Sequence, residues 1–266
     1  MNGRLAGRVA VVTGGSRGIG RGIAIGLGEA GATVYITGRT GKDGAEPRGD
    51  LVGTAEAITA AGGRGIPVFC DHRDDEQVNK AFAQITGETK RLDILVNNAL
   101  GVVPFDVIFS KAPFWELPMS AWDELIDVGL RSHLVAAQHA ARPMVAQRSG
   151  LIVNISSSGA KRRFAILPYG VGKTAVDRMT ADMAQDLDAF GVTVVSYWPP
   201  PTATERMLES AGPDDDPSAW SVPAFNGRVI AALAAAPDLH ARSGSVLVAR
   251  ELAAEFGIED PRQQPA

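Results

Sequence analysis

The sequence predicts an α/β fold: a single doubly wound domain in which helices cover both faces of a parallel sheet of about seven strands. Short apolar runs of the buried-strand type alternate along the chain with longer stretches of helical pattern. This alternation favours a parallel sheet, because each crossover between parallel strands passes over one face of the sheet. No internal repeat, low-complexity segment or linker divides the 266 residues, so we expect one domain.

The expected strands are short, apolar and bounded by residues that end regular structure. The first leads directly into a glycine-rich turn. The sixth runs up to Trp198 and three prolines, which cannot continue a central strand. The full set is Val9–Val12, Thr33–Thr37, Ile66–Cys70, Leu92–Val96, Leu151–Ile155, Val192–Tyr197 and Val246–Ala249.

The expected helices fill the intervals between these strands. Gly62 and Gly63 stop the second helix, because glycine favours the C-terminal end of a helix. Loops are expected over residues 38–49, 101–120 and 211–222, where glycine, proline or polar residues interrupt the pattern. The helices run from the glycine-rich turn to about Gly31, and over Leu51–Ala61, Asp75–Thr86, Trp122–Gln147, Tyr169–Phe190, Arg228–Ala236 and Glu251–Phe256.

Composition and charge argue against several classes of function. The net charge is −4 and no basic stripe is present, so we expect no nucleic-acid partner. No apolar run is long enough to cross a bilayer and the four histidines are scattered, so we expect neither a membrane span nor a metal site. The lone Cys70 is expected to pack, and a chain without a disulfide favours a cytoplasmic location. Lys161-Arg162-Arg163 is interpreted as solvated loop charge.

A glycine-rich turn lies between the first expected strand and the first expected helix. Its glycines let backbone N–H groups approach a pyrophosphate, which side chains at those positions would obstruct. The N-terminus of the following helix also favours an anion. The position predicts a dinucleotide site, and a tight turn without a ligand is the alternative. The expected cofactor-binding residues of this turn are Gly14, Ser16, Arg17, Gly18, Ile19 and Gly20.

The end of the second expected strand indicates which dinucleotide is preferred. NAD sites usually place an Asp or Glu there, on the 2′-hydroxyl of the ribose. This chain has Thr37-Gly38-Arg39 instead, so no acidic side chain repels a 2′-phosphate and Arg39 can pair with it. Arg17 offers a second cation, and arginine can bond a phosphate bidentately. We therefore predict NADP(H) in preference to NAD(H). The alternative is that Arg39 is a solvated loop residue.

Tyr169 and Lys173 form a candidate proton-transfer pair. Residues four apart share one face of a helix. A phenol is a poor acid at neutral pH, with an ordinary pKa of about 10, and a neighbouring ammonium favours the phenolate and lowers that pKa. The spacing predicts a tuned proton donor or acceptor. Two exposed neighbouring side chains without a catalytic role are the alternative.

Several motifs in this order and spacing resemble the short-chain dehydrogenase/reductase family, which implies a Rossmann fold. The resemblance covers residues 5–250, expected to be the catalytic domain, and leaves residues 251–266 as a short C-terminal helix and tail. The motifs are Thr13-Gly14 with Gly18 and Gly20, Asp71, Asn97-Asn98-Ala99, Asn154–Ser157, Tyr169, Lys173, Pro199 and Thr204. Segments that resemble the dehydrogenase/reductase family member 1 group in particular are Tyr35–Arg39, Phe114–Glu116, Asp127–Arg131, Tyr169–Lys173 and Ser243–Leu247.

The resemblance implies a role for each matching residue. Tyr169 is the general acid in reduction and the general base in oxidation. Lys173 bonds the nicotinamide ribose and lowers the pKa of the tyrosine, and a serine after the fifth strand bonds the substrate oxygen. The other implied cofactor contacts are Asp71 at the adenine, Asn98 and Ala99 at the adenosine ribose, and Pro199 and Thr204 near the nicotinamide.

Two serines are candidates for the substrate contact. Spacing back from Tyr169 selects Ser156, whereas spacing forward from Asn154 selects Ser157. Position along a strand fixes the direction of a side chain more tightly than the length of a loop does. We therefore predict Ser157, with Ser156 as the alternative.

Three positions depart from the pattern of the family. Gly129 stands where an Asn is usual. In the family, the main-chain carbonyl at that position helps to hold a water that leads to the lysine, and Gly129 keeps a carbonyl. Pro200 replaces the usual glycine and removes an N–H donor. Leu100 intervenes between Ala99 and Gly101.

Together these features predict an NADP(H)-dependent oxidoreductase that interconverts a carbonyl and a primary or secondary alcohol on a hydrophobic small molecule. A 3-oxoacyl reductase of fatty-acid metabolism and a non-catalytic NADP(H)-binding regulator are the alternatives. The resemblance also implies a homo-dimer or homo-tetramer. Substrate contacts are expected from residues 101–120, 164–168 and 204–222, with apolar side chains from Phe105, Phe109, Phe114, Trp115 and Phe164.

Overall fold

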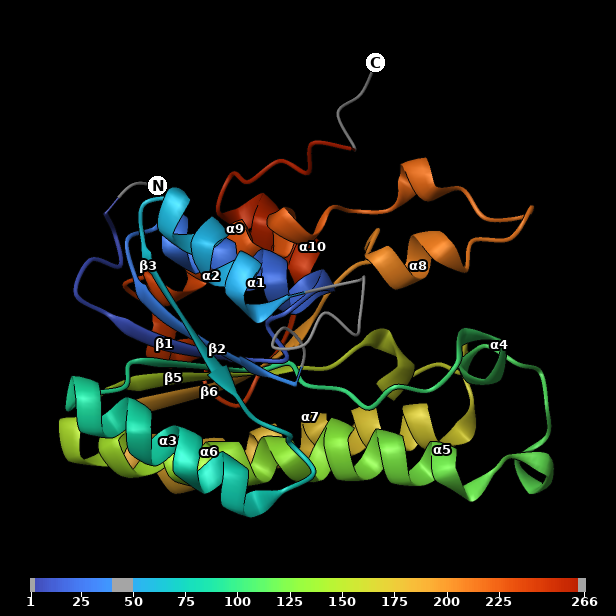
Figure 1. Cartoon of the computed structure of the whole chain (residues 1–266), viewed down its shortest axis with the longest axis horizontal. Helices are drawn as coiled ribbons and strands as arrows, with labels where there is room; N and C mark the ends of the chain where they lie inside the picture. Colours follow the sequence, from blue (N-terminus) through green and yellow to red (C-terminus); the bar gives the residue numbers. More distant parts are fainter. Residues whose placement is uncertain (1–2, 40–49, 263–266) are drawn as a thin grey trace.

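Seven parallel strands form one sheet in the part of the chain that the computed structural model describes, residues 3–39 and 50–262 (Figure 1). Their order across the sheet is β3-β2-β1-β4-β5-β6-β7, which confirms the doubly wound fold. The loop expected over residues 38–49 lies largely outside the described residues. The strands are β1 Val9–Thr13, β2 Thr33–Gly38, β3 Arg64–Phe69, β4 Ile94–Asn97, β5 Gly150–Ile155, β6 Val192–Trp198 and β7 Val246–Val248.

The order of the strands reverses at β1, which lies between β2 and β4. Val12 is opposite Ile36 of β2 on one side and opposite Val96 of β4 on the other. Thr13 Oγ1 accepts a hydrogen bond of 2.9 Å from the backbone N–H of Asn98, so the ends of β1 and β4 are tied together. In doubly wound folds the crevice at this reversal is where ligands bind.

Helices cover both faces of the sheet (Figure 1). One face carries α1, α2, α9 and α10, and the other carries α3, α6 and α7, each over its own apolar core. The central strands β1, β4, β5 and β6 are buried along their whole length, which explains their continuous apolar runs. The helices are α1 Gly18–Glu29, α2 Leu51–Ala60, α3 Asp75–Thr89, α6 Ser132–Gln147, α7 Leu167–Leu187, α9 Pro223–Ala234 and α10 Ala249–Glu255.

Glycines on α1 let it pack closely against α9. A Cβ atom at Gly22 would lie 2.2 Å from the Pro223 oxygen, and one at Gly26 would lie 2.4 Å from the carbonyl carbon of Gly227. A larger residue at either position would force the helices apart. Because α9 holds α1 on one side and the sheet holds it on the other, the N-terminus of α1 has a fixed place at the carboxyl ends of the strands.

Short helices that the sequence pattern did not predict gather beyond the carboxyl ends of the strands (Figure 1). The segment expected as a loop over residues 101–120 folds around a small core, in which Val103 and Ile108 cluster with Ala165 and Ile166. A helix of one turn is too short to show an apolar period. These elements are α4 Phe105–Ile108, η1 Phe114–Glu116, α8 Glu205–Glu209 and η5 Pro217–Ala219. α5 Met119–Asp123 lies in the same region and overlaps the start of the helix expected from Trp122.

The helix expected over Trp122–Gln147 is divided. Between α5 and α6 the backbone is π-helical over η2, Glu124–Arg131. π-Helical turns are rare in proteins, and those that do occur are often found at functional sites. Gly129, which departs from the family pattern, lies within η2. The remaining short helices are η3 Ser158–Ala160, η4 Asp188–Phe190 and η6 Leu239–Arg242.

Two features are absent from residues 3–39 and 50–262. No helix there is both long and apolar enough to cross a bilayer. No group of three or more His, Cys, Asp or Glu side chains in these ranges is arranged to hold a metal ion. At the C-terminal end, α10 begins at Ala249 and buries Leu252 in the core, and the domain boundary at residue 250 stays a prediction.

Candidate active site

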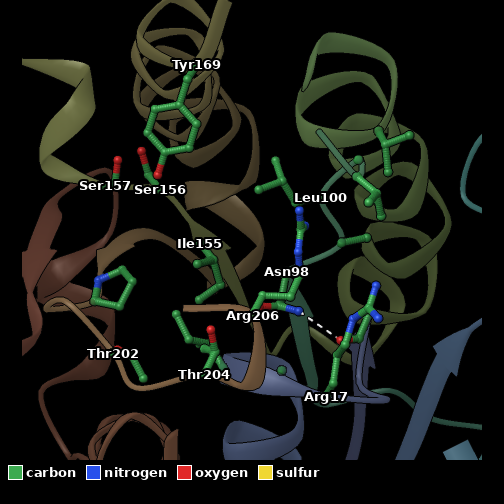
Figure 2. A pocket seen from close by; sticks show the side chains of 18 of the residues that line it. Arg17, Asn98, Leu100, Ile155, Ser156, Ser157, Tyr169, Thr202, Thr204 and Arg206 are labelled. Atoms are coloured by element: carbon green, nitrogen blue, oxygen red, sulfur yellow. Dashed lines mark hydrogen bonds between the residues drawn. The ribbon is translucent and has the colours of Figure 1, made fainter. Parts of the chain in front are cut away.

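A cavity of about 520 Å³ opens at the carboxyl ends of the central strands (Figure 2). Figure 2 shows Tyr169 and Ser157 at one end of it, and Arg17 and Thr204 at the other. Every predicted site residue except Gly18 lines this cavity. The predicted residues in its wall are Gly14, Ser16, Arg17, Ile19, Gly20, Arg39, Asp71, Asn98, Ala99, Ser157, Tyr169, Lys173, Pro199 and Thr204.

The glycine-rich turn fits closely against the loop after β4. The side-chain amide of Asn98 donates to the Thr13 carbonyl at 2.9 Å and to the Gly14 carbonyl at 3.1 Å. A Cβ atom at Gly20 would lie 2.4 Å from Asn98 Nδ2, and Gly14 has a φ of +67°, which favours glycine. The packing of the turn therefore requires both glycines. Asn98, which is expected to line the ribose, also stabilises this turn through these two hydrogen bonds.

The N-terminus of α1 faces a carboxylate. Gly18 begins α1, and its backbone N–H donates to Glu205 Oε2 at 3.0 Å. An anion is favoured here because the first N–H groups of a helix lack partners within the helix and the helix dipole is positive at this end. No sequence motif points to Glu205, because only the folding of the loop after β6 brings it to α1.

Arginines surround Asp71 where β2 and β3 end. Arg39 Nη1 lies 3.8 Å from Asp71 Oδ2, and Arg73 Nη1 lies 3.7 Å from Asp71 Oδ1. All three side chains line the cavity. Arg73 also pairs with Glu124 of η2, so this end of the cavity is tied to the π-helical segment. The carboxylate expected at the adenine therefore lies between two cations, one of which no motif predicted.

A buried histidine lines the same region. His72 is 5% exposed, and its Nε2 lies 2.7 Å from Thr37 Oγ1. Burial lowers the pKa of His72 to about 4, so the ring is neutral at pH 7. Its Nδ1 is buried and has no hydrogen-bond partner among the described residues.

Tyr169 and Lys173 lie one turn apart on α7, as predicted. Lys173 Nζ is 5.8 Å from the centre of the Tyr169 ring and donates to the Ile155 carbonyl at 2.9 Å. Burial lowers the pKa of Lys173 to about 8, and the charge of Asp177 opposes this shift. Burial also raises the pKa of Tyr169, although a hydrogen bond with Ser157 acts in the opposite direction. In the chain alone the net pKa of Tyr169 is therefore raised, because burial has the larger effect, and the lowering of this pKa by Lys173 stays a prediction.

The two serines after β5 have different surroundings. Ser156 Oγ donates to the main-chain carbonyl of Lys173 at 3.1 Å. Ser157 Oγ accepts from the N–H of Gly159 at 3.1 Å and lies beside the Tyr169 side chain, where it acts to lower the pKa of the phenol (Figure 2). The structure thus brings the hydroxyl of Ser157 to the phenol and engages the hydroxyl of Ser156 with the α7 backbone.

Three consecutive prolines form the loop after β6 and line the cavity. Thr202 Oγ1 donates to the Pro200 carbonyl at 2.7 Å. Thr204 Oγ1 accepts from the N–H of Met207 at 3.2 Å and so caps α8. Because proline has no N–H, this loop presents no backbone donor along its prolines. Thr204, expected near the nicotinamide, is thus already engaged in ordering α8.

The wall beside Tyr169 is aromatic. The ring of Phe164 packs edge-on against the ring of Tyr169, with the two centres 5.7 Å apart. Phe114 and Trp115 are 62% and 71% exposed. Of the five aromatic residues expected at the substrate, Phe109 and Phe164 line the cavity, whereas Phe105, Phe114 and Trp115 do not.

Several residues of the wall were not predicted from the sequence to be part of the site. Arg162, interpreted as solvated loop charge, lines the cavity, as does Arg206 of α8. Leu100 lines it as well, and its Cδ1 lies 2.7 Å from where a Cβ atom at Gly129 would be. The sequence offered one indication that Arg162 lies in the wall: it belongs to a cationic run shortly after the serine motif. For the others, only the convergence of loops after different strands decides the position.

Comparisons with known proteins agree with this geometry. The sequence model of the short chain dehydrogenase family matches residues 8–215. The chain is 41% identical to dehydrogenase/reductase SDR family member 1 of Mus musculus, over 98% of this chain and 85% of that protein. It is 41% identical to the Homo sapiens protein of the same name, over 97% and 85%. A solved short-chain dehydrogenase/reductase from Serratia marcescens superposes with a TM-score of 0.78 at 32% identity, covering 92% of this chain and 97% of that one. The chain therefore belongs to the short-chain dehydrogenase/reductase family of oxidoreductases.

Proposed function

We propose that this chain is an NADP(H)-dependent oxidoreductase that interconverts a carbonyl group and an alcohol on a hydrophobic small molecule. One observation carries the proposal: Ser157, Tyr169 and Lys173 meet in a cavity whose wall also contains Arg17 and Arg39. A proton donor and several cations in one elongated crevice suit a phosphorylated dinucleotide with a substrate at its end.

Each of the three side chains has a distinct proposed task. Tyr169 gives its proton to the carbonyl oxygen in reduction and takes it back in oxidation, a role typically worth about 10²- to 10⁴-fold in rate. Ser157 hydrogen-bonds the same oxygen and holds it against the phenol. The ammonium of Lys173 stabilises the phenolate that remains. The nicotinamide, when bound, supplies or accepts the hydride.

The charges around the end of β2 support a preference for NADP(H). The segment Thr37-Gly38-Arg39 has no carboxylate to accept a hydrogen bond from a ribose 2′-hydroxyl. Asp71 lies between Arg39 and Arg73, and these ion pairs reduce its repulsion of an anion. A 2′-phosphate could pair with both guanidinium groups, whose planar forks suit phosphate oxygens.

The departures from the family pattern remove no group that this proposal uses. Gly129 keeps the main-chain carbonyl through which the family holds a water that leads to the lysine, so we propose that the relay survives. Pro200 removes an N–H and no side chain that takes part in proton transfer. The meeting of Ser157 with Tyr169 favours catalysis over a regulator that only binds NADP(H).

The proposal of a hydrophobic substrate is supported by Phe109, Phe164 and Leu100 in the cavity wall. We also propose a homo-oligomer, because Leu167 and Val171 present exposed apolar side chains on α7. The cytoplasmic location stays a prediction.

Fluorescence titration with NADPH and NADH, on the wild-type protein and on Arg39→Ala, tests the cofactor preference. We expect the wild type to bind NADPH more tightly. The variant should lose roughly ten- to hundredfold in affinity for NADPH and little for NADH, since a charge-assisted contact to phosphate is worth roughly 1.5–3 kcal/mol. Similar affinities of the wild type for both cofactors would contradict the preference.

Turnover of a panel of hydrophobic aldehydes and ketones with NADPH tests the activity itself. We expect the wild-type protein to reduce some of them, and Tyr169→Phe to lose nearly all turnover while it still binds NADPH. If NADPH binds, no compound is reduced and Tyr169→Phe changes nothing, the chain is a regulator rather than an enzyme.

A further inference from the structure

The cavity wall is more cationic than the proposed cofactor explains. Among the described residues that line it, six are Arg or Lys and only Asp71 is an Asp or Glu, although the chain has a net charge of −4. The proposed dinucleotide accounts for the cations at its phosphates and at its ribose. Arg206 is held at the segment before α4, where it donates to the Val103 carbonyl at 2.7 Å. Arg162 is left without an assigned partner.

Arg162 lies on the side of the cavity where Tyr169 stands. Its guanidinium carbon is 5.9 Å from the centre of the Phe164 ring, and that ring is 5.7 Å from the centre of the Tyr169 ring. The Phe164 ring thus lies next to both the proton donor and the cation. No carboxylate in the described part of the chain pairs with the Arg162 guanidinium, so its charge is available to a ligand.

We propose that Arg162 binds a carboxylate of the substrate. This inference rests on the proposed function and narrows it: the substrate is a carbonyl compound in which an apolar segment separates the carbonyl from a carboxylate. The carbonyl lies at Tyr169 and Ser157, the apolar segment lies along Phe164, and the carboxylate lies at Arg162. A guanidinium can bond a carboxylate bidentately, and its contact with the Phe164 ring already orients it.

Arg163 provides a matched control. It is the next residue, it carries the same charge, and its Nη2 lies 3.5 Å from the Ala112 carbonyl. It does not line the cavity. Both arginines are exposed, so neither substitution should disturb the fold. A general effect of lost surface charge would appear in both variants, whereas recognition of the substrate would appear only in Arg162→Gln.

The test compares the reduction of methyl-ketone carboxylic acids of increasing chain length with that of their methyl esters, with NADPH at saturation. The acid and the ester share the reacting carbonyl and the apolar chain and differ in charge. We expect the wild-type protein to prefer the acids at one range of chain lengths. Arg162→Gln should lower kcat/KM for those acids about tenfold, mainly through KM, and leave the esters within about twofold. Added salt should reduce the preference for acids in the wild type.

The outcomes separate this inference from the proposed function. If the wild-type protein reduces acids and esters equally well, or if Arg163→Gln lowers activity on acids as much as Arg162→Gln does, the inference is wrong and the oxidoreductase stands. An equal loss on acids and esters in Arg162→Gln also overturns it, because the arginine would then only support Phe164. If the wild-type protein reduces no carbonyl compound at all, the proposed function itself fails.

Discussion

Gly18 donates its backbone N–H to Glu205 Oε2 at 3.0 Å, so a carboxylate from the first residue of α8 lies at the N-terminus of α1. The same end of the helix is where a pyrophosphate is favoured in a dinucleotide site. A carboxylate there stabilises the chain alone, and it also opposes the arrival of another anion by charge repulsion. The contact therefore links the ordering of α8 to the proposed binding of the cofactor.

Replacing Glu205 with Gln should tighten the binding of NADPH. The amide oxygen can still accept from Gly18, but the negative charge is gone. A charge at a helix N-terminus is worth about 0.3–1 kcal/mol, so we expect a decrease in Kd of roughly two- to fivefold, measured by fluorescence titration. Glu209→Gln, at the other end of α8, removes the same charge and should change the affinity less. Weaker binding by Glu205→Gln would contradict the prediction.

A side chain at residue 129 should conflict with Leu100. A Cβ atom at Gly129 would lie 2.7 Å from Leu100 Cδ1, so the leucine fills the space that the usual Asn would take. We expect Gly129→Asn to lower both the thermal unfolding midpoint and kcat, because close-packed side chains tolerate added volume poorly.

Adding Leu100→Ala to Gly129→Asn should recover part of both losses, because the smaller side chain leaves room for the Asn. The two substitutions would then be non-additive, as expected for residues in contact. If Gly129→Asn alone greatly increases turnover, the prediction is wrong: the glycine would then weaken the water relay to Lys173, and its packing against Leu100 would not matter for activity. If the double variant is no better than Gly129→Asn, the leucine is not the obstacle.

Ser157→Ala should lose most activity, whereas Ser156→Ala should keep most of it. The hydroxyl of Ser157 lies beside the Tyr169 side chain, while that of Ser156 donates to a main-chain carbonyl. We expect a loss of about 10²-fold or more in kcat for Ser157→Ala, comparable to the removal of a donor at a developing oxyanion. Affinity for NADPH, measured separately, should stay unchanged in Ser157→Ala. The reverse ranking of the two variants would assign the role to Ser156.

Lys173→Met should stabilise the protein without cofactor while it abolishes turnover. Burial lowers the pKa of Lys173 from 10.5 to about 8, so the folded state disfavours the ammonium. At pH values below about 8 the charged lysine destabilises the fold by up to about 3 kcal/mol. Between pH 8 and 10.5 the unfolded chain binds more protons than the folded chain, so the free energy of unfolding of the wild type rises with pH.

Thermal unfolding from pH 7 to 10.5 measures this effect. The advantage of Lys173→Met over the wild type should be largest at pH 7 and should shrink as the pH rises. A variant that is less stable than the wild type by the same amount at every pH would show that the bond of Lys173 to the Ile155 carbonyl dominates.

Local sequence patterns were sufficient to predict the strands of the sheet and the main helices. The apolar runs that predicted β1 and β5 are confirmed, because strands buried on both faces leave a continuous signal. β3 begins at Arg64, earlier than the expected Ile66, although Gly65 and Pro67 disfavour strands. Pairing with β2 overrides this preference, and β3 is an edge strand, where proline is tolerated.

The sequence by itself determined the alternation of strands and helices, the glycine-rich turn, and the placement of Tyr169 and Lys173 on one helix face. These features depend on residues close together in the chain, where the period of a helix or strand dictates direction. Only the tertiary structure decided that Glu205 meets Gly18 and that Arg162 joins the wall beside Tyr169. Those contacts arise where loops from separate strands converge at the reversal of the strand order. The raised pKa of Tyr169 and the lowered pKa of Lys173 follow from the burial of these side chains in the folded chain.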